Sequence, residues 1–474
     1  MQAESHYRYE QISNTIRSAI LAGSMKEGEK LNSVRTLSKQ LGVSQSTVFR
    51  AYYDLESDGL IESRPKSGYY VSFQRIATSL PNTQNFKNVA RLISNQELVT
   101  EFQSSLGHPL VKVDLGLAVP APELLPLAKI KKSIQKSYLN DNQAFINYEP
   151  VEGNTKLRAQ LSKLALSWGK SVKLDDVIVT NGCMEAISLS LSVLTKPGDL
   201  IAIESPAYYG LLQLIDNLQL KVIEIPGNSE TGISMDFLEE VLKEKSIKAV
   251  LLSPNFNNPD GAIIPDEHKR QIVQWASQYQ IPIIEDDIYG ELYFGESRPK
   301  TCKTFDQYGW VIYCSSLSKT LMPGYRIGWC MPGKFRAEFL RKKSVTNIAT
   351  SSIVQAIAAH YLEFGRYQYH LKKLRGALKI QHQQYKRAIF DHFPSKIPCS
   401  NPSGGFVLWL ELKKSQDAVS LFRKGLESGI RIAPGQMFFA HPNYKNYFRI
   451  SFGKPLTENV ENAIKQLGQL ATLI

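Results

Sequence analysis

The sequence predicts a small, mainly helical N-terminal domain with a β-hairpin, followed by a large α/β domain that ends in a smaller α+β lobe. Two observations support this fold class. Apolar residues recur at helical spacing through the first 73 residues, whereas short apolar strands alternate with helical stretches beyond residue 110. The chain has 474 residues, a length that allows one small domain beside a large one.

The composition narrows the class of protein further. Hydrophobic residues make up 43% and charged residues 21%, which is typical of a globular chain and disfavours disorder or fibrous repeats. No apolar run approaches the ~18 residues of a membrane span, and the first ten residues carry both charge signs, so we expect neither a membrane partner nor a signal peptide. The net charge of +12 permits nucleic-acid binding without establishing it.

The cysteines indicate a reducing compartment. Their number is odd and their spacing is wide, so they predict neither a disulfide framework nor a CxxC metal site. We therefore expect a cytoplasmic protein without a bound metal. The five cysteines are Cys183, Cys302, Cys314, Cys330 and Cys399.

The first helix is predicted from a stripe of apolar residues. Tyr9, Ile12, Ile16 and Ile20 lie three or four positions apart, which places them on one face of a helix. Gly23 can end that helix.

Two further helices and a hairpin complete the N-terminal domain. Ser33 is a suitable N-cap for a short helix that Gly42 breaks, and Ser44 can cap a third helix that closes near Gly59. The segment 61–71 then places β-rich residues on both sides of the turn-forming stretch 64–68, the pattern of a β-hairpin.

The second and third helices have the proportions of a helix-turn-helix. Polar side chains at the exposed start of the third helix can bind phosphates and read base edges in the major groove, and the hairpin tip adds basic residues. By itself the pattern fits equally well a small helical domain that binds protein, or that binds nothing.

A longer segment carries a family resemblance. The stretch GEKLNSVRTLSKQLGVSQSTVFRAYYDLESDGLIESRPKSGYYV closely resembles the winged helix-turn-helix of GntR-type transcription regulators, and the resemblance covers residues 6–73. It implies double-stranded operator DNA as a partner. The DNA contacts that it implies are Ser33, Arg35, Ser44, Gln45, Thr47, Arg50 and Lys66.

Residues 74–105 are expected to form a linker. The segment QRIATSLPNTQNFKNVA is polar and weakly periodic, and a short helix is expected within NQELVTEFQSSL near the end of the linker. This interpretation makes residues 74–105 a tether that belongs to neither core, and it starts the large domain at residue 106.

The large domain is predicted from strands spaced by helices. Such a pattern indicates a mostly parallel, buried sheet, and ligands gather at the carboxyl ends of its strands. The last two strand segments, FVLWLEL and YFRISFG, are assigned to the smaller lobe. The preceding strand segments are DVIVT, DLIAIESP, KAVLLSP, IPIIEDD, GWVIYCSS and YRIGWCMP.

Lys319 is the first candidate for chemistry. It follows a serine-containing loop at the end of a strand, where partial desolvation lowers the pKa of a lysine and favours Schiff-base formation. Ser316, Ser318 and Arg326 can supply phosphate ligands beside it. Alone this pattern is weak, because most such lysines are surface residues.

Other strand ends carry matching side chains. Asp286 ends a buried strand, where it can pair with a protonated pyridine nitrogen, and Tyr289 can donate to a ring oxygen. Asn258 lies in a turn that can reach the same oxygen. Tyr208 follows the next strand, where its ring can stack on a planar cofactor.

A helix start supplies a further candidate. In TNGCMEAISL the amides of Gly182, Cys183 and Met184 can hold a phosphate at a helix N-terminus. Each feature alone is explained as readily by a structural turn or a core aromatic. Five of them at successive strand ends are hard to explain as coincidence.

Together these residues resemble the fold type I aminotransferases that bind pyridoxal 5′-phosphate, over residues 110–474. The resemblance implies Lys319 as the aldimine lysine and Asp286 on the pyridine nitrogen. It further places Asn258 and Tyr289 on the phenolic oxygen and Tyr208 against the ring. The residues implied around the phosphate are Gly182, Cys183, Ser316 and Arg326.

Three more positions follow from the same resemblance. In INYEPVEGNTKLRAQL, Tyr148 matches the tyrosine that reaches the phosphate of the neighbouring subunit, and in YFRISFG, Arg449 matches the arginine that pairs with a substrate carboxylate. Gly116 in GLAVPAPELLP is expected near the substrate. Cys183-Met184 replaces the Ser/Ala-Gln that is more usual in the family, which removes one side-chain phosphate contact but keeps the amides.

A GntR-type winged helix joined to an aminotransferase-like domain is the architecture of the MocR family of bacterial regulators. The resemblance implies a homodimeric transcription regulator that binds pyridoxal 5′-phosphate and senses an amino compound, or the cofactor itself, by aldimine chemistry. A second hypothesis is a pyridoxal phosphate-dependent aminotransferase with a vestigial or secondary DNA-binding domain. A third treats the cofactor as a structural support of the dimer.

Overall fold

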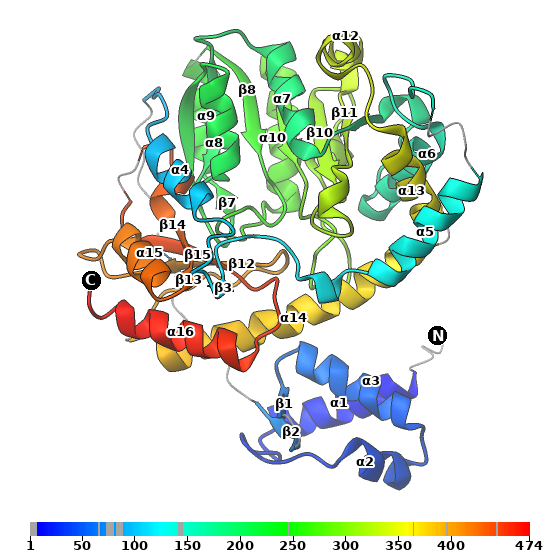
Figure 1. Cartoon of the computed structure of the whole chain (residues 1–474), viewed down its shortest axis with the longest axis vertical. Helices are drawn as coiled ribbons and strands as arrows, with labels where there is room; N and C mark the ends of the chain where they lie inside the picture. Colours follow the sequence, from blue (N-terminus) through cyan, green and yellow to red (C-terminus); the bar gives the residue numbers. More distant parts are fainter. Residues whose placement is uncertain are drawn as a thin grey trace.

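The computed structural model describes residues 7–64, 67–72, 80–81, 89–140, 146–244, 246–363, 365–394, 397–441 and 444–474. Figure 1 shows a small N-terminal domain beneath a large α/β domain, with the long helix α14 between them.

The N-terminal domain is built from three helices and a two-stranded hairpin. Ser33 and Ser44 cap the second and third helices, because their side chains accept hydrogen bonds from the amides of Thr36 (3.1 Å) and Thr47 (3.2 Å). Gly42 ends the second helix in the left-handed region with φ 63°. These findings confirm the predicted elements. Their bounds are α1 Arg8–Leu21, α2 Val34–Leu41, α3 Gln45–Ser57, β1 Ile61–Arg64 and β2 Gly68–Val71.

The large domain contains an eight-stranded sheet in the order β4-β11-β10-β9-β8-β5-β6-β7. The pairs from β10 through β6 are parallel, whereas β11 and β7 run antiparallel to their neighbours. The six predicted strands are confirmed, and β6 and the edge strand β7 extend the sheet beyond β5. The bounds are β4 Ile178–Thr180, β5 Leu200–Ser205, β6 Lys221–Asn228, β7 Gly232–Ile233, β8 Ile247–Leu252, β9 Ile283–Asp286, β10 Val311–Ser316 and β11 Gly328–Met331.

Helices cover both faces of this sheet because alternate strand residues point to opposite sides. Ile203 and Leu251 pack in one core with α7 and α8, whereas Ala202 and Val250 pack in another with α9 and α10. The helices of the large domain are α5 Leu127–Asn140, α6 Thr155–Leu164, α7 Cys183–Leu194, α8 Tyr209–Asn217, α9 Met235–Glu244, α10 Asp266–Tyr279, α11 Cys302–Phe305, α12 Arg336–Asn347 and α13 Ser352–Glu363.

The smaller lobe contains a three-stranded sheet in the order β12-β15-β14 and a two-stranded pairing of β13 with β3. This arrangement confirms the predicted α+β lobe. Its elements are β3 Val113–Asp114, α14 Arg366–His392, β12 Val407–Glu411, α15 Ala418–Glu427, β13 Ile430–Arg431, β14 Ala433–Pro434, β15 Tyr447–Ser451 and α16 Glu458–Leu470.

The second half of the expected linker packs in the large domain. Helix α4 (Gln96–Ser104) buries Val99 and Phe102 in the core of the smaller lobe. The side-chain amide of Asn95 donates to the carbonyls of Met437 and Phe439, each at 2.9 Å. Residues 95–105 therefore pack with the smaller lobe and do not form part of a separate linker. Of residues 73–88, only 80 and 81 are among the described residues.

The N-terminal domain contacts α14 through ion pairs. Lys379 on α14 donates to Asp58 at 2.7 Å, and Arg17 of α1 binds the other oxygen of the same carboxylate. Arg387 lies about two turns beyond Lys379 on α14 and pairs with Glu62 of the hairpin. The two domains are therefore held together by charged groups rather than by a shared apolar core.

Three further properties bear on function. Among the helices of the described ranges, none is long and apolar enough to cross a membrane. Within the same ranges, no group of three or more His, Cys, Asp or Glu side chains is placed to hold a metal ion. All five cysteines are free and buried.

Candidate functional site

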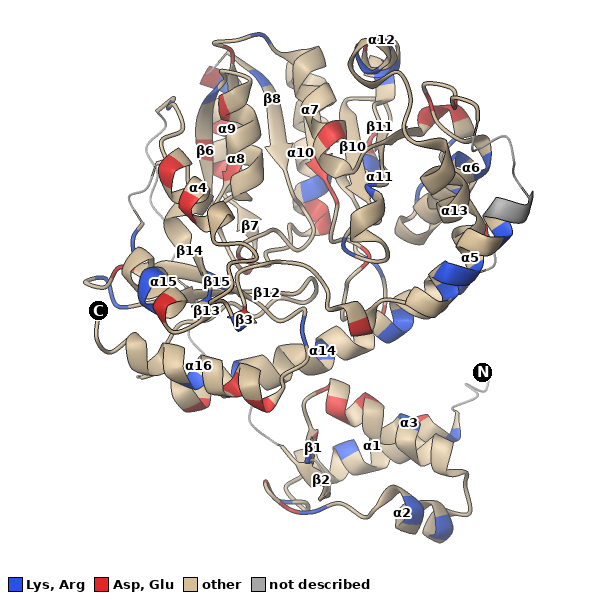
Figure 2. Ribbon diagram, viewed as in Figure 1, with Lys and Arg blue, Asp and Glu red and all other residues tan. Residues whose placement is uncertain are grey.

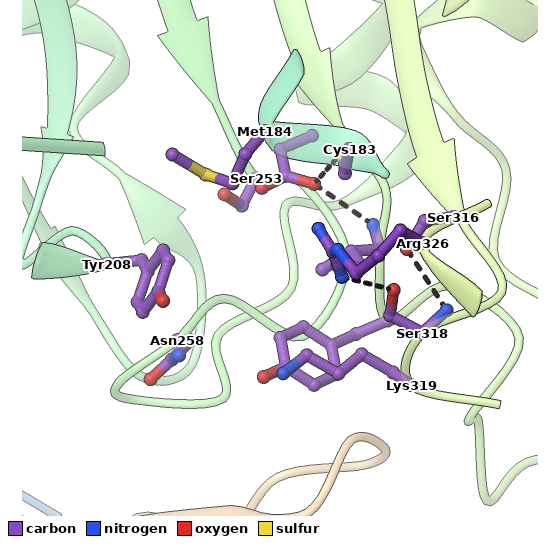
Figure 3. Close-up of a pocket in the computed structure, with 12 residues that line it drawn as sticks. Cys183, Met184, Tyr208, Ser253, Asn258, Ser316, Ser318, Lys319 and Arg326 are labelled. Carbon is purple, nitrogen blue, oxygen red and sulfur yellow. Dashed lines mark hydrogen bonds between the residues drawn. The ribbon is translucent and has the colours of Figure 1, made fainter. Parts of the chain in front are cut away.

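A cavity lies at the carboxyl ends of the large-domain strands, where the sequence places the candidate side chains. Figure 3 shows these side chains, which come from four strand ends and the start of α7, pointing toward a common space. Ser253 and Ile288 also line the cavity and were not predicted. The predicted residues that line it are Cys183, Met184, Tyr208, Asn258, Asp286, Tyr289, Ser316, Ser318, Lys319 and Arg326.

Lys319 lies in the wall of this cavity, just after β10. Its ammonium group donates to the carbonyl of Ala118 at 2.7 Å. Burial and then the nearby charge of Arg449 lower the pKa of Lys319 to about 8, and the carboxylate of Asp286 only partly offsets them. At pH 7 about a tenth of the side chain is therefore the neutral, nucleophilic amine, far more than for a lysine in water.

Asp286 ends β9 inside the same cavity. Its Oδ1 accepts the amide of Ile288 and the thiol of Cys183, each at 3.2 Å. Burial raises the pKa of Asp286 to about 6, while these two donors lower it. The Cys183 side chain is thus directed at a carboxylate rather than into the phosphate region.

The phosphate region is formed by two segments that approach each other. Arg326 donates to the hydroxyl of Ser318 at 3.2 Å, and the Ser318 amide donates to the hydroxyl of Ser316 at 3.2 Å (Figure 3). Gly182 adopts φ +83°, and a side chain there would collide with the Arg326 guanidinium. The first amides of α7 follow Gly182 and have no partner within the helix, which suits them to an anion.

Another part of the cavity wall is formed by Tyr208, Asn258 and Tyr289. The Tyr289 hydroxyl is buried beside Asn258 and makes no hydrogen bond of standard geometry with any described residue. Tyr208 leans against Tyr209, with ring centroids 4.7 Å apart. A buried phenol without a partner is costly unless a ligand supplies one.

Arg449 on β15 of the smaller lobe is buried next to the cavity, where it contacts the lining residue Asn258. Its Nη1 donates to Oδ1 of Asn258 at 2.9 Å, and its Nη2 donates to the carbonyl of Gly116. Its Nε is buried and has no partner among the described residues. The structure therefore brings Arg449 and Gly116 together, as expected, beside Asn258.

Tyr148 is the one predicted cofactor residue that lies apart. Its side chain is 85% exposed, and its neighbour Ile146 is 76% exposed. Neither residue lines the cavity of its own chain.

Sequence reasoning also missed two groups at this edge of the sheet, Ser253 and Glu204. Ser253 directly follows β8, so the strand-end rule that singled out Asp286 could have found it. Glu204 in β5 accepts the Ser253 amide, and burial raises the pKa of Glu204 to about 8. The sequence carries no signal for that contact, because the two residues lie on different strands.

The candidate DNA-reading residues lie at the starts of α2 and α3. Arg35 and Gln45 are exposed, whereas Ser33 and Ser44 use their hydroxyls as helix caps. Thr47 is half-buried and makes a hydroxyl contact with Ser44 at 2.8 Å. Lys66 lies outside the described residues.

Arg50 on α3 is held by neighbours instead of extending freely. It pairs with Asp54 at 3.3 Å and lies over the rings of Tyr9 and Tyr53.

A groove runs between this face of α3 and the start of α14, where Lys372 and Lys373 add positive charge; Figure 2 shows basic residues along α14 on this side.

Comparison with known proteins supports both halves of the chain. A family model described as "Bacterial regulatory proteins, gntR family" matches residues 8–71, and one described as "Aminotransferase class I and II" matches residues 112–467. The chain is 36% identical to the uncharacterized HTH-type transcriptional regulator YjiR of Escherichia coli, over 98% of both chains. It is 35% identical to YdcR of the same organism, again over 98% of both chains.

The chain belongs to the MocR family. This regulator carries a GntR-type winged helix fused to an aminotransferase class I and II domain. Among solved structures, the large domain resembles Pyrococcus horikoshii kynurenine aminotransferase, described in complex with PMP. The TM-score is 0.74 at 28% identity, over 80% of this chain and 96% of the other.

The MocR chain has a large domain of the class that uses pyridoxal 5′-phosphate, and the cavity fits that cofactor. Three features support this fit. Lys319 has a lowered pKa, the Tyr289 hydroxyl makes no hydrogen bond of standard geometry with a described residue, and Gly182 leaves room for the Arg326 guanidinium. Pyridoxal phosphate is therefore the cofactor of this regulator.

Proposed function

We propose that this MocR regulator binds operator DNA as a homodimer and responds to an amino compound that carries a carboxylate. The observation that carries this proposal is the position of Arg449. Its guanidinium donates to Asn258, which lines the cavity that holds Lys319, and its charge lowers the pKa of Lys319. Its Nε has no partner among the described residues. A planar guanidinium beside a reactive amine suits a ligand with both an amino group and a carboxylate.

The roles of the cavity residues follow from their geometry. Bound pyridoxal phosphate supplies an aldehyde that condenses with amines and a ring that withdraws electrons. Lys319 would hold the cofactor by its amine, and Asp286 would accept a hydrogen bond from the pyridine nitrogen. Asn258 uses its free amide donor toward the phenolic oxygen, since its oxygen is bound to Arg449. Tyr289 shares that oxygen, and Tyr208 lies against the ring.

The phosphate is assigned to groups that converge at the start of α7. Amides at a helix N-terminus favour an anion, and Arg326 adds a positive charge beside them. The residues assigned to the phosphate are Gly182, Cys183, Met184, Ser316, Ser318 and Arg326, with the Cys183 contribution limited to its amide.

A homodimer is proposed because Tyr148 matches, by resemblance, a tyrosine that reaches the phosphate of the neighbouring subunit. The 85% exposure of Tyr148 and the exposed Ile146 beside it support a surface that a neighbouring subunit covers. Two subunits would present two winged helices, so we expect an operator with paired half-sites.

The DNA-binding domain is assigned to residues 6–73. Its proposed contacts are those at the starts of α2 and α3 together with the hairpin tip. A regulator of this kind acts where the DNA is, so we propose the cytoplasm as its location. The proposed DNA contacts are Ser33, Arg35, Ser44, Gln45, Thr47, Arg50 and Lys66.

The effector test uses the full chain loaded with cofactor. Amino compounds with and without a carboxylate are titrated, while the visible absorbance of the bound cofactor and the anisotropy of labelled operator DNA are recorded. We expect carboxylate-bearing amines to change both signals. Lys319→Ala should lose the absorbance change and the response of DNA binding to the ligand. An unchanged response of Lys319→Ala to effector would contradict the proposal.

Transamination is the second candidate function, favoured by the complete site and by the lowered pKa of Lys319, which suits a base. Steady-state kinetics with an amino donor and a keto acid separates the two functions. Many turnovers per cofactor, together with DNA binding that ignores the donor, would establish an enzyme instead of a sensor.

A further inference from the structure

The thiol of Cys183 occupies an unusual position for a residue at the start of the phosphate-binding helix. Its sulfur lies 3.2 Å from Oδ1 of Asp286, and the side chains of both residues are buried. The Ile288 amide donates to the same oxygen, also at 3.2 Å. Within the described ranges no group donates to the other oxygen, Oδ2, and Asp286 lines the cavity.

The surroundings of Asp286 have opposing effects on whether its carboxyl group is ionised. Burial and the neighbouring carboxylate of Asp287 favour the neutral acid, whereas Lys319 favours the ion. Glu204 is the other acid whose charge reaches this site, but burial raises its pKa to about 8, so it is mainly neutral at pH 7. Two hydrogen-bond donors therefore matter to whether Asp286 is ionised.

The Cys183 thiol is suited to act as a permanent donor. Burial, followed by the nearby Asp286 charge, raises the pKa of this thiol well above its usual range. It therefore keeps its proton across the physiological range and cannot become a competing anion. Of the two donors on Oδ1, it is the one that a side-chain substitution can remove.

We propose that Cys183 is a positioning residue that holds Asp286 ionised and aims its free oxygen at the pyridine nitrogen of the cofactor. The inference rests on the cofactor occupying this cavity. An ionised Asp286 keeps the proton on the ring nitrogen, whereas a more basic carboxylate would draw that proton to itself. The thiol thereby keeps the ring electron-withdrawing without touching the cofactor.

Three variants separate this role from packing. Cys183→Ser retains a donor, Cys183→Ala removes it and leaves space, and Cys183→Val removes it while overfilling that space. Cys399→Ala is the matched control, because Cys399 is a buried thiol in the smaller lobe that does not line the cavity.

The first measurement is the nitrogen chemical shift of pyridoxal phosphate labelled at the ring nitrogen, bound to the full chain at neutral pH. We expect a protonated ring in the wild type, in Cys183→Ser and in Cys399→Ala. In Cys183→Ala and Cys183→Val the ratio of protonated to neutral ring should fall about tenfold, the size of one hydrogen bond to a charged group.

The second measurement is the infrared S–H stretching band of the protein without cofactor. The band lost on Cys183→Ser substitution should have the lowered frequency of a thiol donating to a carboxylate. A free-thiol frequency, or unchanged nitrogen shifts in Cys183→Ala and Cys183→Val, would overturn the inference. Failure of the wild type to bind the cofactor would instead refute the proposed function, while the infrared band still tests the hydrogen bond.

Discussion

Lys319 illustrates how the cavity alters the chemistry of one side chain. An amine surrounded by protein and close to the Arg449 guanidinium is less easily protonated than one in water. Its pKa of about 8 lies below that of a free lysine, so the neutral form becomes dominant above pH 8.

Cofactor uptake should therefore depend on pH. We expect the rate at which the cofactor-free protein binds pyridoxal phosphate to rise about tenfold per pH unit up to about pH 8 and then to level off. Stopped-flow absorbance measures this rate. Arg449→Gln removes a charge that lowers the pKa of Lys319, so its profile should level off at higher pH. A wild-type profile that still climbs at pH 10 would contradict the prediction.

Arg449 should set the preference for a carboxylate. Arg449→Lys keeps the charge but loses the planar fork, so the affinity for carboxylate-bearing amines should fall about tenfold. The change in visible absorbance on titration reports this affinity. The matching amine without a carboxylate is the control, and its affinity should stay within a factor of about two. Equal losses for both ligands would show that Arg449 only supports the fold.

At this scale the sequence predicts which residues meet, but not how each is oriented. Asp286 and Asn258 were found because ligands gather at strand ends. The turn of the Cys183 thiol toward Asp286 depends on the rotation of α7 over the sheet. The bond between Arg449 and Asn258 depends on the smaller lobe closing over the cavity. Neither of these appears in local sequence.

Among the elements, α3 depends on its cap. Ser44 accepts the Thr47 amide, so Ser44→Ala should destabilise the N-terminal domain by about 1 kcal/mol. Hydrogen exchange of the α3 amides in the full chain measures the loss. Ser46→Ala is the control, because Ser46 lies in the first turn and its hydroxyl bonds only the Ser44 side chain. Similar losses in both variants would argue against a capping role.

Two elements show where prediction from sequence ends. Strand β6 is not predicted because a buried acid, Glu224, interrupts its apolar run and no glycine or proline separates the strand from helix α8. Helix α4 was expected, but assigned to a linker. Its apolar residues Val99 and Phe102 could not be matched to a partner, because Asn95 and α4 pack against a segment more than 300 residues later.

For the whole molecule, the contact between the domains is a set of charges that mutation can reverse. Lys379→Glu would face the carboxylate of Asp58, so the N-terminal domain should move away from α14. Small-angle scattering should then give a larger radius of gyration than for the wild type at low salt. Arg17 remains beside Asp58, which limits the loss of stability within the domain.

The reciprocal variant tests whether the effect comes from this pair. Asp58→Lys combined with Lys379→Glu restores opposite charges across the contact but sets a lysine beside Arg17, so it should recover part of the wild-type dimensions, because residues in contact are coupled. High salt should have the same effect as the single substitution, since it screens exposed pairs. Unchanged dimensions in every variant would show that the ion pairs do not determine the domain arrangement.

Helix α14 is 27 residues long, or about 40 Å from end to end. It packs on α16 of the smaller lobe, on α13 of the large domain and on α3 of the N-terminal domain (Figure 1). A tilt of about 5° would displace one end relative to the other by about 3.5 Å. Because the ion pairs of Lys379 and Arg387 attach the N-terminal domain to the middle and C-terminal part of this helix, a tilt imposed by the lobe that carries Arg449 would turn the N-terminal domain with it.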